Sequence, residues 1–121
     1  MITTKFESVR GDTYSRDFSI KKSNWNKPID EIYFTLKASE TDKNIVMQKK
    51  LSLDNGITLM EKADDGTYYY NITIGATETD DFKVDKDYYF DIQILIGAIK
   101  KTIIKGMFVV SYDITRTRDE K

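Results

Sequence analysis

The sequence predicts an all-β fold, an antiparallel β-sandwich of about seven or eight short strands. Apolar residues recur at every second position along most segments, which is the pattern of strands with one buried face. Turn-forming residues separate these segments at intervals of about 8–12 residues. The two longest alternating segments, Tyr88–Ile96 and Ile99–Arg116, flank Gly97 and Ala98. Glycine there fits the positive φ of a two-residue hairpin turn. A small closed barrel is the alternative arrangement.

The other elements follow from the same two signals. In chain order, further strands are predicted at residues 5–9, 14–20, 32–38, 45–53, 57–60 and 67–74. Turns are expected at 10–12, 54–56 and 64–66, because Asn, Asp and Gly tolerate left-handed backbone. The two turns around 57–60 indicate a meander. Arg16 is the exception on the apolar face of the second strand. Thr77, with Asp80 three residues later, starts at most one helical turn near residues 78–82.

Composition bounds the class of protein. The chain has 121 residues, which is enough for a single domain over 1–121, with 116–121 as a frayed charged tail. It contains no cysteine, which excludes disulfides and thiolate chemistry. It also contains no histidine, the commonest general acid–base group and the commonest transition-metal ligand. No P-loop or dinucleotide motif and no paired nucleophile is present, so we expect neither an enzyme nor a cofactor.

Charge and hydropathy narrow the partners. The chain has 19 basic and 20 acidic residues, well mixed, for a net charge of −1. Such a balance gives little support to nucleic-acid binding. The apolar runs are far shorter than the roughly 20 residues that cross a bilayer, so no membrane partner is expected. The first residues, MITTKFESVRGD, lack the apolar core of a signal peptide, so secretion by that route is not expected.

Three of the candidate contact residues lie in turns or loops. Arg10 and Asp12 belong to an Arg-Gly-Asp tripeptide. This tripeptide can bind integrins, but turn chemistry alone explains it, with Gly11 at positive φ. Trp25 lies in the polar segment 22–28 and is the strongest single candidate, because aromatic anchors dominate binding interfaces. It either folds back over an end of the sandwich or forms an exposed anchor.

The other two candidate contacts are Tyr69 and Tyr89, on strands. Their neighbours Tyr68, Tyr70 and Tyr88 occupy the core positions of the alternation, so both candidates should point outward. Two outward tyrosines form either a cross-strand pair or a platform for a sugar ring. Strands favour aromatic residues in any case, which supports the first interpretation.

An acidic cluster surrounds Phe82. Its members are Glu78, Asp80, Asp81, Asp85 and Asp87. Calcium needs six to eight oxygen ligands, and the spacing does not match an EF-hand loop. We therefore expect a solvated loop beside a capped helical turn, and no metal.

Several short sequence motifs, taken in their order along the chain, resemble those of a known family. They are Arg10-Gly11-Asp12-Thr13 before Phe18-Ser19-Ile20, Pro28-Ile29-Asp30 before 32–37, Gly66-Thr67-Tyr68, Thr77–Phe82 before Tyr88–Gln93, and Gly106–Val110 closing on Asp113–Arg116. Together, over about residues 8–116, they resemble the immunoglobulin-like N-terminal domain of siphophage baseplate upper proteins and related small tail-associated phage proteins. The resemblance implies an immunoglobulin-like sandwich.

The same resemblance implies a non-enzymatic structural role in a phage or prophage virion, at the tail or baseplate. The partners would be other tail or baseplate proteins, with a homo-oligomer also possible. Such a protein is assembled in the host cytoplasm and resides in the virion. The alternative function is a carbohydrate- or cell-surface-binding module that uses exposed aromatics.

Overall fold

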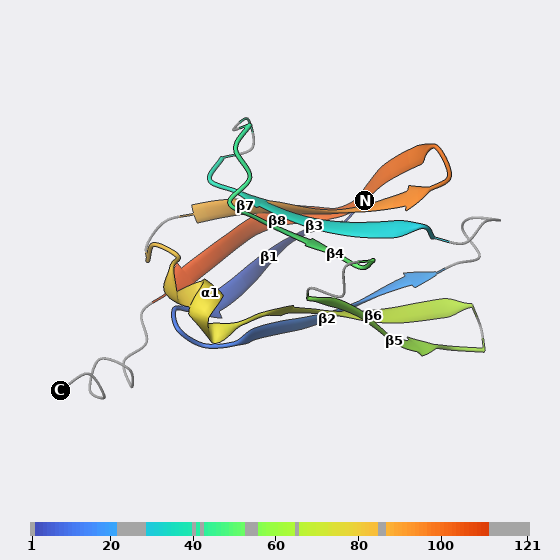
Figure 1. Ribbon diagram of the computed structural model, residues 1–121, viewed down its shortest axis with the longest axis horizontal. Coiled ribbons are helices and arrows are strands. Elements are labelled where there is room, and N and C mark those ends of the chain that lie inside the picture. The colour runs from blue at the N-terminus through green and yellow to red at the C-terminus, as the bar shows by residue number, and fades with distance from the viewer. Residues whose placement is uncertain are drawn as a thin grey trace.

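The computed structural model describes residues 2–21, 29–39, 41, 43–52, 56–64, 66–84 and 87–111. This part of the chain folds into two packed sheets with a short helix at one end (Figure 1). The elements are β1 (Ile2–Val9), β2 (Tyr14–Lys21), β3 (Glu31–Lys37), β4 (Met47–Lys50), β5 (Ile57–Lys62), β6 (Thr67–Ile74), α1 (Ala76–Asp80), β7 (Asp87–Ile96) and β8 (Ile99–Ser111). The predicted all-β sandwich is confirmed.

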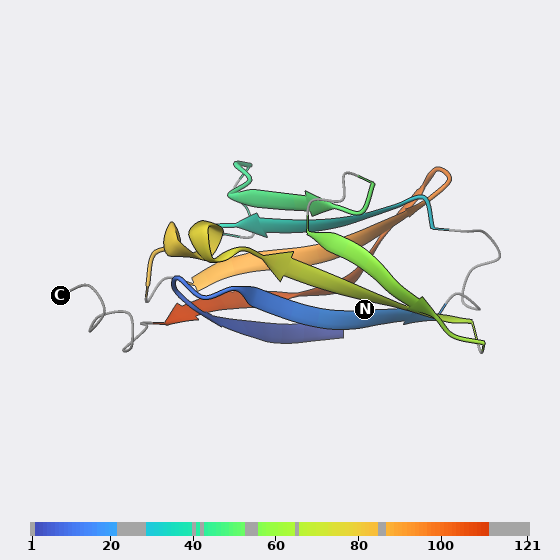
Figure 2. The ribbon, with the colours of Figure 1, turned by 60° about the horizontal axis from the view of Figure 1, so that its bottom comes forward.

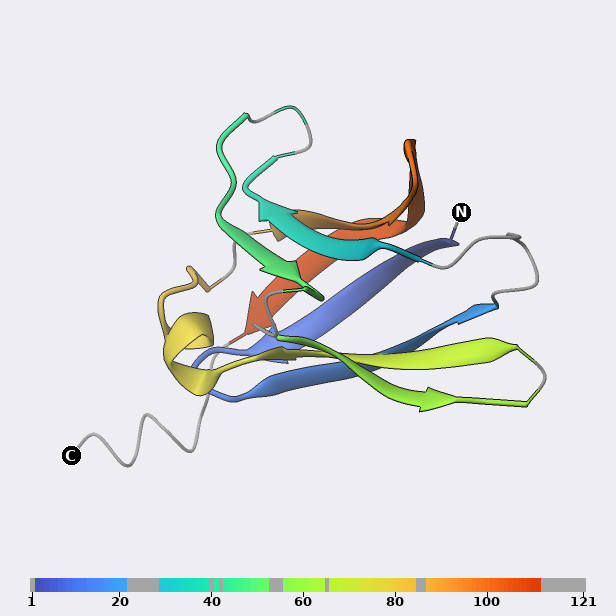
Figure 3. The ribbon, with the colours of Figure 1, turned by 45° about the vertical axis from the view of Figure 1, so that its right-hand side comes forward.

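The strand order makes the sandwich immunoglobulin-like. Immunoglobulin sandwiches combine their second, fifth and fourth main strands in one sheet and place the hairpin of the last two strands in the other. Here β2-β6-β5 form a three-stranded sheet, and β1-β8-β7-β3-β4 form a five-stranded sheet. Figures 2 and 3 show the two layers from other sides. The closed barrel is wrong, because no pairing joins the two sheets among the described strands.

One strand pair departs from the antiparallel expectation. β1 pairs with β8 in parallel, from Ile2 opposite Ile104 to Val9 opposite Ser111. The turn after Val9 carries the chain to the other sheet, so β1 and β2 are not a hairpin. β1 instead covers the free edge of β8, which the long closing hairpin would otherwise expose. Alternating hydrophobicity is the same in parallel and antiparallel pairs, so the sequence pattern did not reveal this.

Several boundaries also differ from expectation. β1 begins at Ile2, β4 covers only Met47–Lys50, and β5 extends to Lys62. β5 and β6 do pair, but β4 lies in the other sheet, so the predicted meander is wrong. The helix covers 76–80 rather than 78–82. Its N-cap is Gly75, not Thr77, because the Glu78 carboxylate accepts the Gly75 N–H at 3.1 Å. The predicted turn residues 54, 55 and 65 and strand residues 112–116 lie outside the described residues.

The core between the sheets is rich in aromatic rings. Phe90 on β7 stacks on Phe6 at 4.2 Å between ring centroids and on Phe34 at 5.7 Å. In antibody domains the residue two positions after a buried tyrosine of this strand is a disulfide cysteine. Phe90 occupies that position, two residues after Tyr88. These three rings belong to one sheet, and the contact between the layers comes from Tyr14 on β2, whose ring centroid lies 5.8 Å from that of Phe6 and 5.1 Å from that of Phe108. In this chain without cysteine, aromatic packing therefore joins the layers through Tyr14.

Arg16, the exception on the second strand, has a structural explanation. It lies on edge strand β2, and its guanidinium carbon is 5.0 Å from the centre of the Phe6 ring. Its side chain covers the core at the sandwich edge while the residue stays exposed. An inward-facing charge on an edge strand also hinders unwanted pairing with another sheet.

The helix end is tied down by Tyr88 and Thr79. The Lys83 N–H donates to the Tyr88 hydroxyl at 3.0 Å. A tyrosine at this corner that bonds back to the backbone is a hallmark of immunoglobulin-like sandwiches. The fully buried Thr79 hydroxyl donates to the Asp12 carbonyl at 2.7 Å and accepts the Gly11 N–H at 3.1 Å. The helix and the 10–13 turn are thereby joined.

The closing hairpin matches its prediction over the described residues. Gly97 has φ +59°, and Ile96 pairs with Ile99. The Gly97 N–H donates to the Asp30 carboxylate at 2.6 Å, which attaches the hairpin tip to the start of β3. Further along β8, Gly106 approaches β1 closely. A Cβ at that position would lie 1.6 Å from the Thr4 carbonyl oxygen, so only glycine fits there.

Candidate functional site

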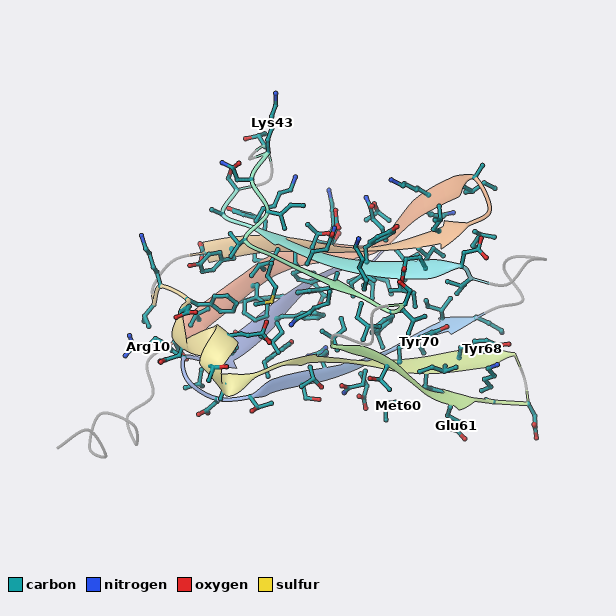
Figure 4. The ribbon with its side chains drawn as sticks, in the orientation of Figure 1. Arg10, Lys43, Met60, Glu61, Tyr68 and Tyr70 are labelled. Atoms are coloured by element: carbon teal, nitrogen blue, oxygen red, sulfur yellow. The ribbon has the colours of Figure 1, made fainter. Side chains whose placement is uncertain are left out.

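The structure separates the predicted contact residues rather than collecting them. Trp25 lies outside the described residues. Arg10 and Asp12 lie in the turn between β1 and β2, beside α1; Figure 4 shows Arg10 at that end. Tyr69 is on β6 and Tyr89 on β7, so they belong to opposite sheets. They form neither a cross-strand pair with each other nor a shared sugar platform.

The Arg10–Asp12 segment is a fixed turn. Gly11 has φ +86°, and the Asp12 N–H donates to the Val9 carbonyl at 3.0 Å. The Arg10 N–H donates to the Ser111 carbonyl at 3.0 Å. With the two bonds to Thr79, these contacts show that the tripeptide forms a hydrogen-bonded turn.

Tyr89 lies in a groove of about 460 Å³ on the outer face of the five-stranded sheet. We call this surface the groove face. Two adjacent rows of outward side chains build it across β3, β7, β8 and β1. The first row is Lys37, Tyr89, Met107 and Lys5, and the second is Thr35, Asp91, Lys105 and Thr3. Direct neighbours in such rows are about 5 Å apart, so these residues form one continuous surface.

The groove carries a net positive charge in an almost neutral chain. Three lysines and one carboxylate, that of Asp91, line it. Partial burial raises the pKa of Asp91, and nearby Lys37 opposes the rise. Lys5 forms a 3.2 Å ion pair with Glu7, and both of these side chains are largely exposed. Lys37 and Lys105 therefore dominate the positive field over the groove floor.

Two projections border the groove face along the strand direction. The connection from β3 to β4, with Lys43 at its tip, rises on one side, and the tip of the β7–β8 hairpin rises on the other (Figures 1, 3 and 4). Both carry exposed apolar residues. Ile45 and Val46 are 50% and 46% exposed, and Ile99 is 61% exposed. Exposed apolar side chains around a concavity that also carries charged groups are typical of contact surfaces.

Sequence reasoning selected Tyr89 but missed its neighbours Lys37, Asp91 and Lys105. These residues come from three strands and meet only through the pairing register. The one sequence signal was that each alternates with a core residue, which predicts an outward side chain. That signal applies equally to every other outward residue, so it does not single them out.

The predicted acidic cluster has a structural role in part. The Glu78 carboxylate forms a 2.7 Å ion pair with the Lys49 ammonium. It also caps α1 by accepting a hydrogen bond from the Gly75 N–H. Burial works to raise the pKa of Glu78, but these hydrogen bonds and the Lys49 charge lower it overall. Asp85 lies outside the described residues. In the described part of the chain no group of three or more acidic side chains is placed to hold a metal ion.

A catalytic pair requires two cooperating groups in reach of one substrate. Among the described groove-lining residues, Asp91 is the single carboxylate, with lysine and threonine side chains in the neighbouring strands. Tyr14 and Tyr70, whose pKa values are raised by burial, lie in the core instead.

Over the described ranges, no helix has the length and apolarity needed to span a bilayer.

Comparisons with known proteins give distant similarities. No family model and no curated protein matches the chain. A structure from a photo-crosslinking study of multimeric cell-adhesive interactions of VGSC beta subunits is 10% identical over 92% of both chains, with a TM-score of 0.45. A homodimeric extracellular domain of the voltage-gated sodium channel beta4 subunit is 12% identical over 93% of both chains, with a TM-score of 0.42. Murine CRIg is 5% identical over 90% of this chain and 92% of its own, with a TM-score of 0.39. Identities and TM-scores of this size give no basis for assigning a function.

Proposed function

We propose that this domain is a non-enzymatic protein-interaction module and that it contacts its partner through the groove face. The observation that carries the proposal is the continuous groove across four strands, bordered by two projections with exposed isoleucines. Protein interfaces combine a few apolar anchors with a polar, hydrogen-bonding surround. Ile45 and Ile99 supply anchors of this kind, and the threonines and lysines of the two rows supply the polar groups.

We further propose that the module is a structural component of a phage or prophage tail or baseplate, with other tail or baseplate proteins as partners. The ordered motifs from Arg10 to Arg116 support this assignment, because they resemble domains of such proteins. A chain without histidine or cysteine also suits a structural role. The carbohydrate alternative loses support, because Tyr69 and Tyr89 lie on opposite sheets and cannot stack on one sugar.

Site-specific photo-crosslinking tests the contact surface. A photoreactive phenylalanine at Gln93, the outward residue that follows Asp91 on β7 and borders the groove face, should form an adduct with one defined polypeptide when the protein is expressed in its own source. The matched control places the same group at Ser19, on the outer face of the three-stranded sheet, where no adduct is expected. Equal yields at both positions, or no adduct at either, would contradict a contact through the groove face.

Particle fractionation tests the phage assignment. After prophage induction in the source organism, particles are purified by density gradient and their proteins are quantified by mass spectrometry. The chain should co-purify with tail proteins at a constant ratio, and its Gln93 adduct should contain a tail or baseplate protein. A chain that is expressed but absent from the particles would show that the virion assignment is wrong.

A further inference from the structure

We propose that the groove face takes an acidic, extended segment of the partner polypeptide, whose carboxylates bind Lys37, Lys105 and Lys5. This inference rests on the proposed function and names the chemistry of the ligand at the same site. The three lysines come from β3, β8 and β1, so their ammonium groups are distributed across the sheet rather than clustered at one point. A ligand that meets all three must run across the strands.

The spacing of the lysines matches an extended chain. Lys37 and Lys5 occupy the two ends of one row, three strand intervals apart, which is about 14 Å. Lys105 lies between them in the adjacent row. Alternate side chains of an extended peptide are about 7 Å apart on one face, so acidic residues at i, i+2 and i+4 cover about the same span. An alternating acidic segment therefore fits the rows better than a compact anion does.

The floor of the groove favours a polypeptide over other anionic polymers. Thr35 and Thr3 offer hydroxyls at the two ends of the second row, suited to amide and carboxylate oxygens. Tyr89 is half-buried within its row. Nucleic-acid grooves follow a continuous phosphate chain with many cations and stacking rings. Here Asp91 interrupts the positive charge in the middle of the groove.

Asp91 supplies a diagnostic of the site. It pairs across the strands with Lys105 on one side and Thr35 on the other, so an acidic ligand must approach it. Its negative charge should weaken binding of that ligand while it partly neutralises the two adjacent lysines. Removing this carboxylate should therefore strengthen binding, whereas removing a lysine should weaken it.

The test uses defined peptides and the whole chain. The probe is an eight-residue peptide of alternating Glu and Thr, and its matched control carries Gln in place of Glu. Binding is measured by NMR titration and by calorimetry at low and high salt. The Glu probe should bind at least about tenfold more tightly than the Gln probe, and added salt should reduce the difference by screening. Amide shifts should concentrate in β3, β7, β8 and β1.

Removing lysines and removing the Asp91 carboxylate should change the affinity for the Glu probe in opposite directions. The double variant Lys37→Gln/Lys105→Gln should weaken Glu-probe binding by about fivefold to tenfold, because it removes two exposed charge pairs. Asp91→Asn should strengthen it by about twofold to fivefold. The control Lys21→Gln/Lys62→Gln removes the same charge from the three-stranded sheet and should leave binding unchanged. Circular dichroism verifies that each variant is folded.

Three results would overturn the inference. They are no detectable binding of the Glu probe, equal losses in the groove and control variants, and tighter binding of an oligothymidylate than of the Glu probe. The crosslinking test at Gln93 separates the two proposals. An adduct at Gln93 together with an inactive Glu probe would reject the acidic ligand and retain the interaction surface, whereas failure of both tests would reject the surface itself.

Discussion

The hydroxyl of Tyr88 shows how one atom fixes the end of the sandwich. It accepts the Lys83 N–H, and its ring lies 5.5 Å from the Phe82 ring. Phe82 in turn meets Phe108 on β8 edge to face, with the ring centroids 5.8 Å apart. The loop after α1 is therefore held both by a hydrogen bond and by aromatic packing. The sequence identified Tyr88 as a core residue, but the hydroxyl contact became visible only in the structure.

Replacing Tyr88 with phenylalanine tests that hydrogen bond. Tyr88→Phe keeps the ring but leaves the Lys83 N–H without its acceptor, so the free energy of unfolding should fall by about 1 kcal/mol. Urea denaturation measures the change. Tyr69→Phe is the matched control, because Tyr69 is 40% exposed and its loss should stay within about 0.5 kcal/mol. Equal effects in the two variants would show that the corner bond does not stabilise the fold.

At the scale of elements, the Lys49–Glu78 ion pair connects β4 with α1. Lys49 lies on a short edge strand and points inward, with its side chain 11% exposed, whereas that of Glu78 is 39% exposed. The stem of Lys49 also packs against Gly56, where a Cβ would lie 2.8 Å from its Cδ. The two partners are thus unequal, because a buried ammonium depends on its counter-ion more than a partly hydrated carboxylate does.

This asymmetry predicts unequal mutational costs. Glu78→Ala leaves the buried Lys49 ammonium without a partner and removes the α1 cap, so it should cost about 2–3 kcal/mol. Lys49→Met replaces the ammonium with an apolar group and leaves Glu78 to hydrate, so its cost should stay below about 1 kcal/mol. Thermal unfolding of both variants measures this. A larger loss in Lys49→Met than in Glu78→Ala would contradict the proposed dependence.

For the whole molecule, buried titratable groups set the pH range of stability. Burial raises the pKa of Tyr14 to about 12, against the opposing charge of Arg16, and burial also raises the pKa of Tyr70. The pKa values of Glu31 and Glu78 are lowered, because hydrogen bonds from Ser52 and Lys49 outweigh burial. The pKa of Asp91 is raised, so its effect on the pH dependence of stability is opposite to that of Glu31 and Glu78. The fold is accordingly most stable between the acidic pH at which the glutamates protonate and the alkaline pH at which the tyrosines ionise.

The free energy of unfolding, measured as a function of pH, should fall both at alkaline pH and at acidic pH. Above about pH 10 the unfolded chain loses tyrosine protons that the folded chain keeps, so stability falls towards pH 12, by about 2–3 kcal/mol for Tyr14. Tyr14→Phe should flatten this limb, because phenylalanine keeps the buried ring and has no hydroxyl that titrates there. Below about pH 4.5 stability should fall as Glu78 and Glu31 protonate, and Glu78→Gln should reduce that fall. If Tyr14→Phe loses as much stability above pH 10 as the original protein does, Tyr14 is not the cause of that loss.

The sequence alone determined the class of fold, the closing hairpin and nearly every core position. These follow from local physics, since period-two burial and the positive φ of Gly97 depend only on neighbouring residues. Tertiary structure alone decided the parallel β1–β8 pair, the separation of Tyr69 from Tyr89, and the meeting of Lys37, Asp91 and Lys105. Those features depend on which strands pair and in what register, and alternation is identical for every pairing partner. The groove face is therefore a property of the assembled sheet, built from residues that no single segment brings together.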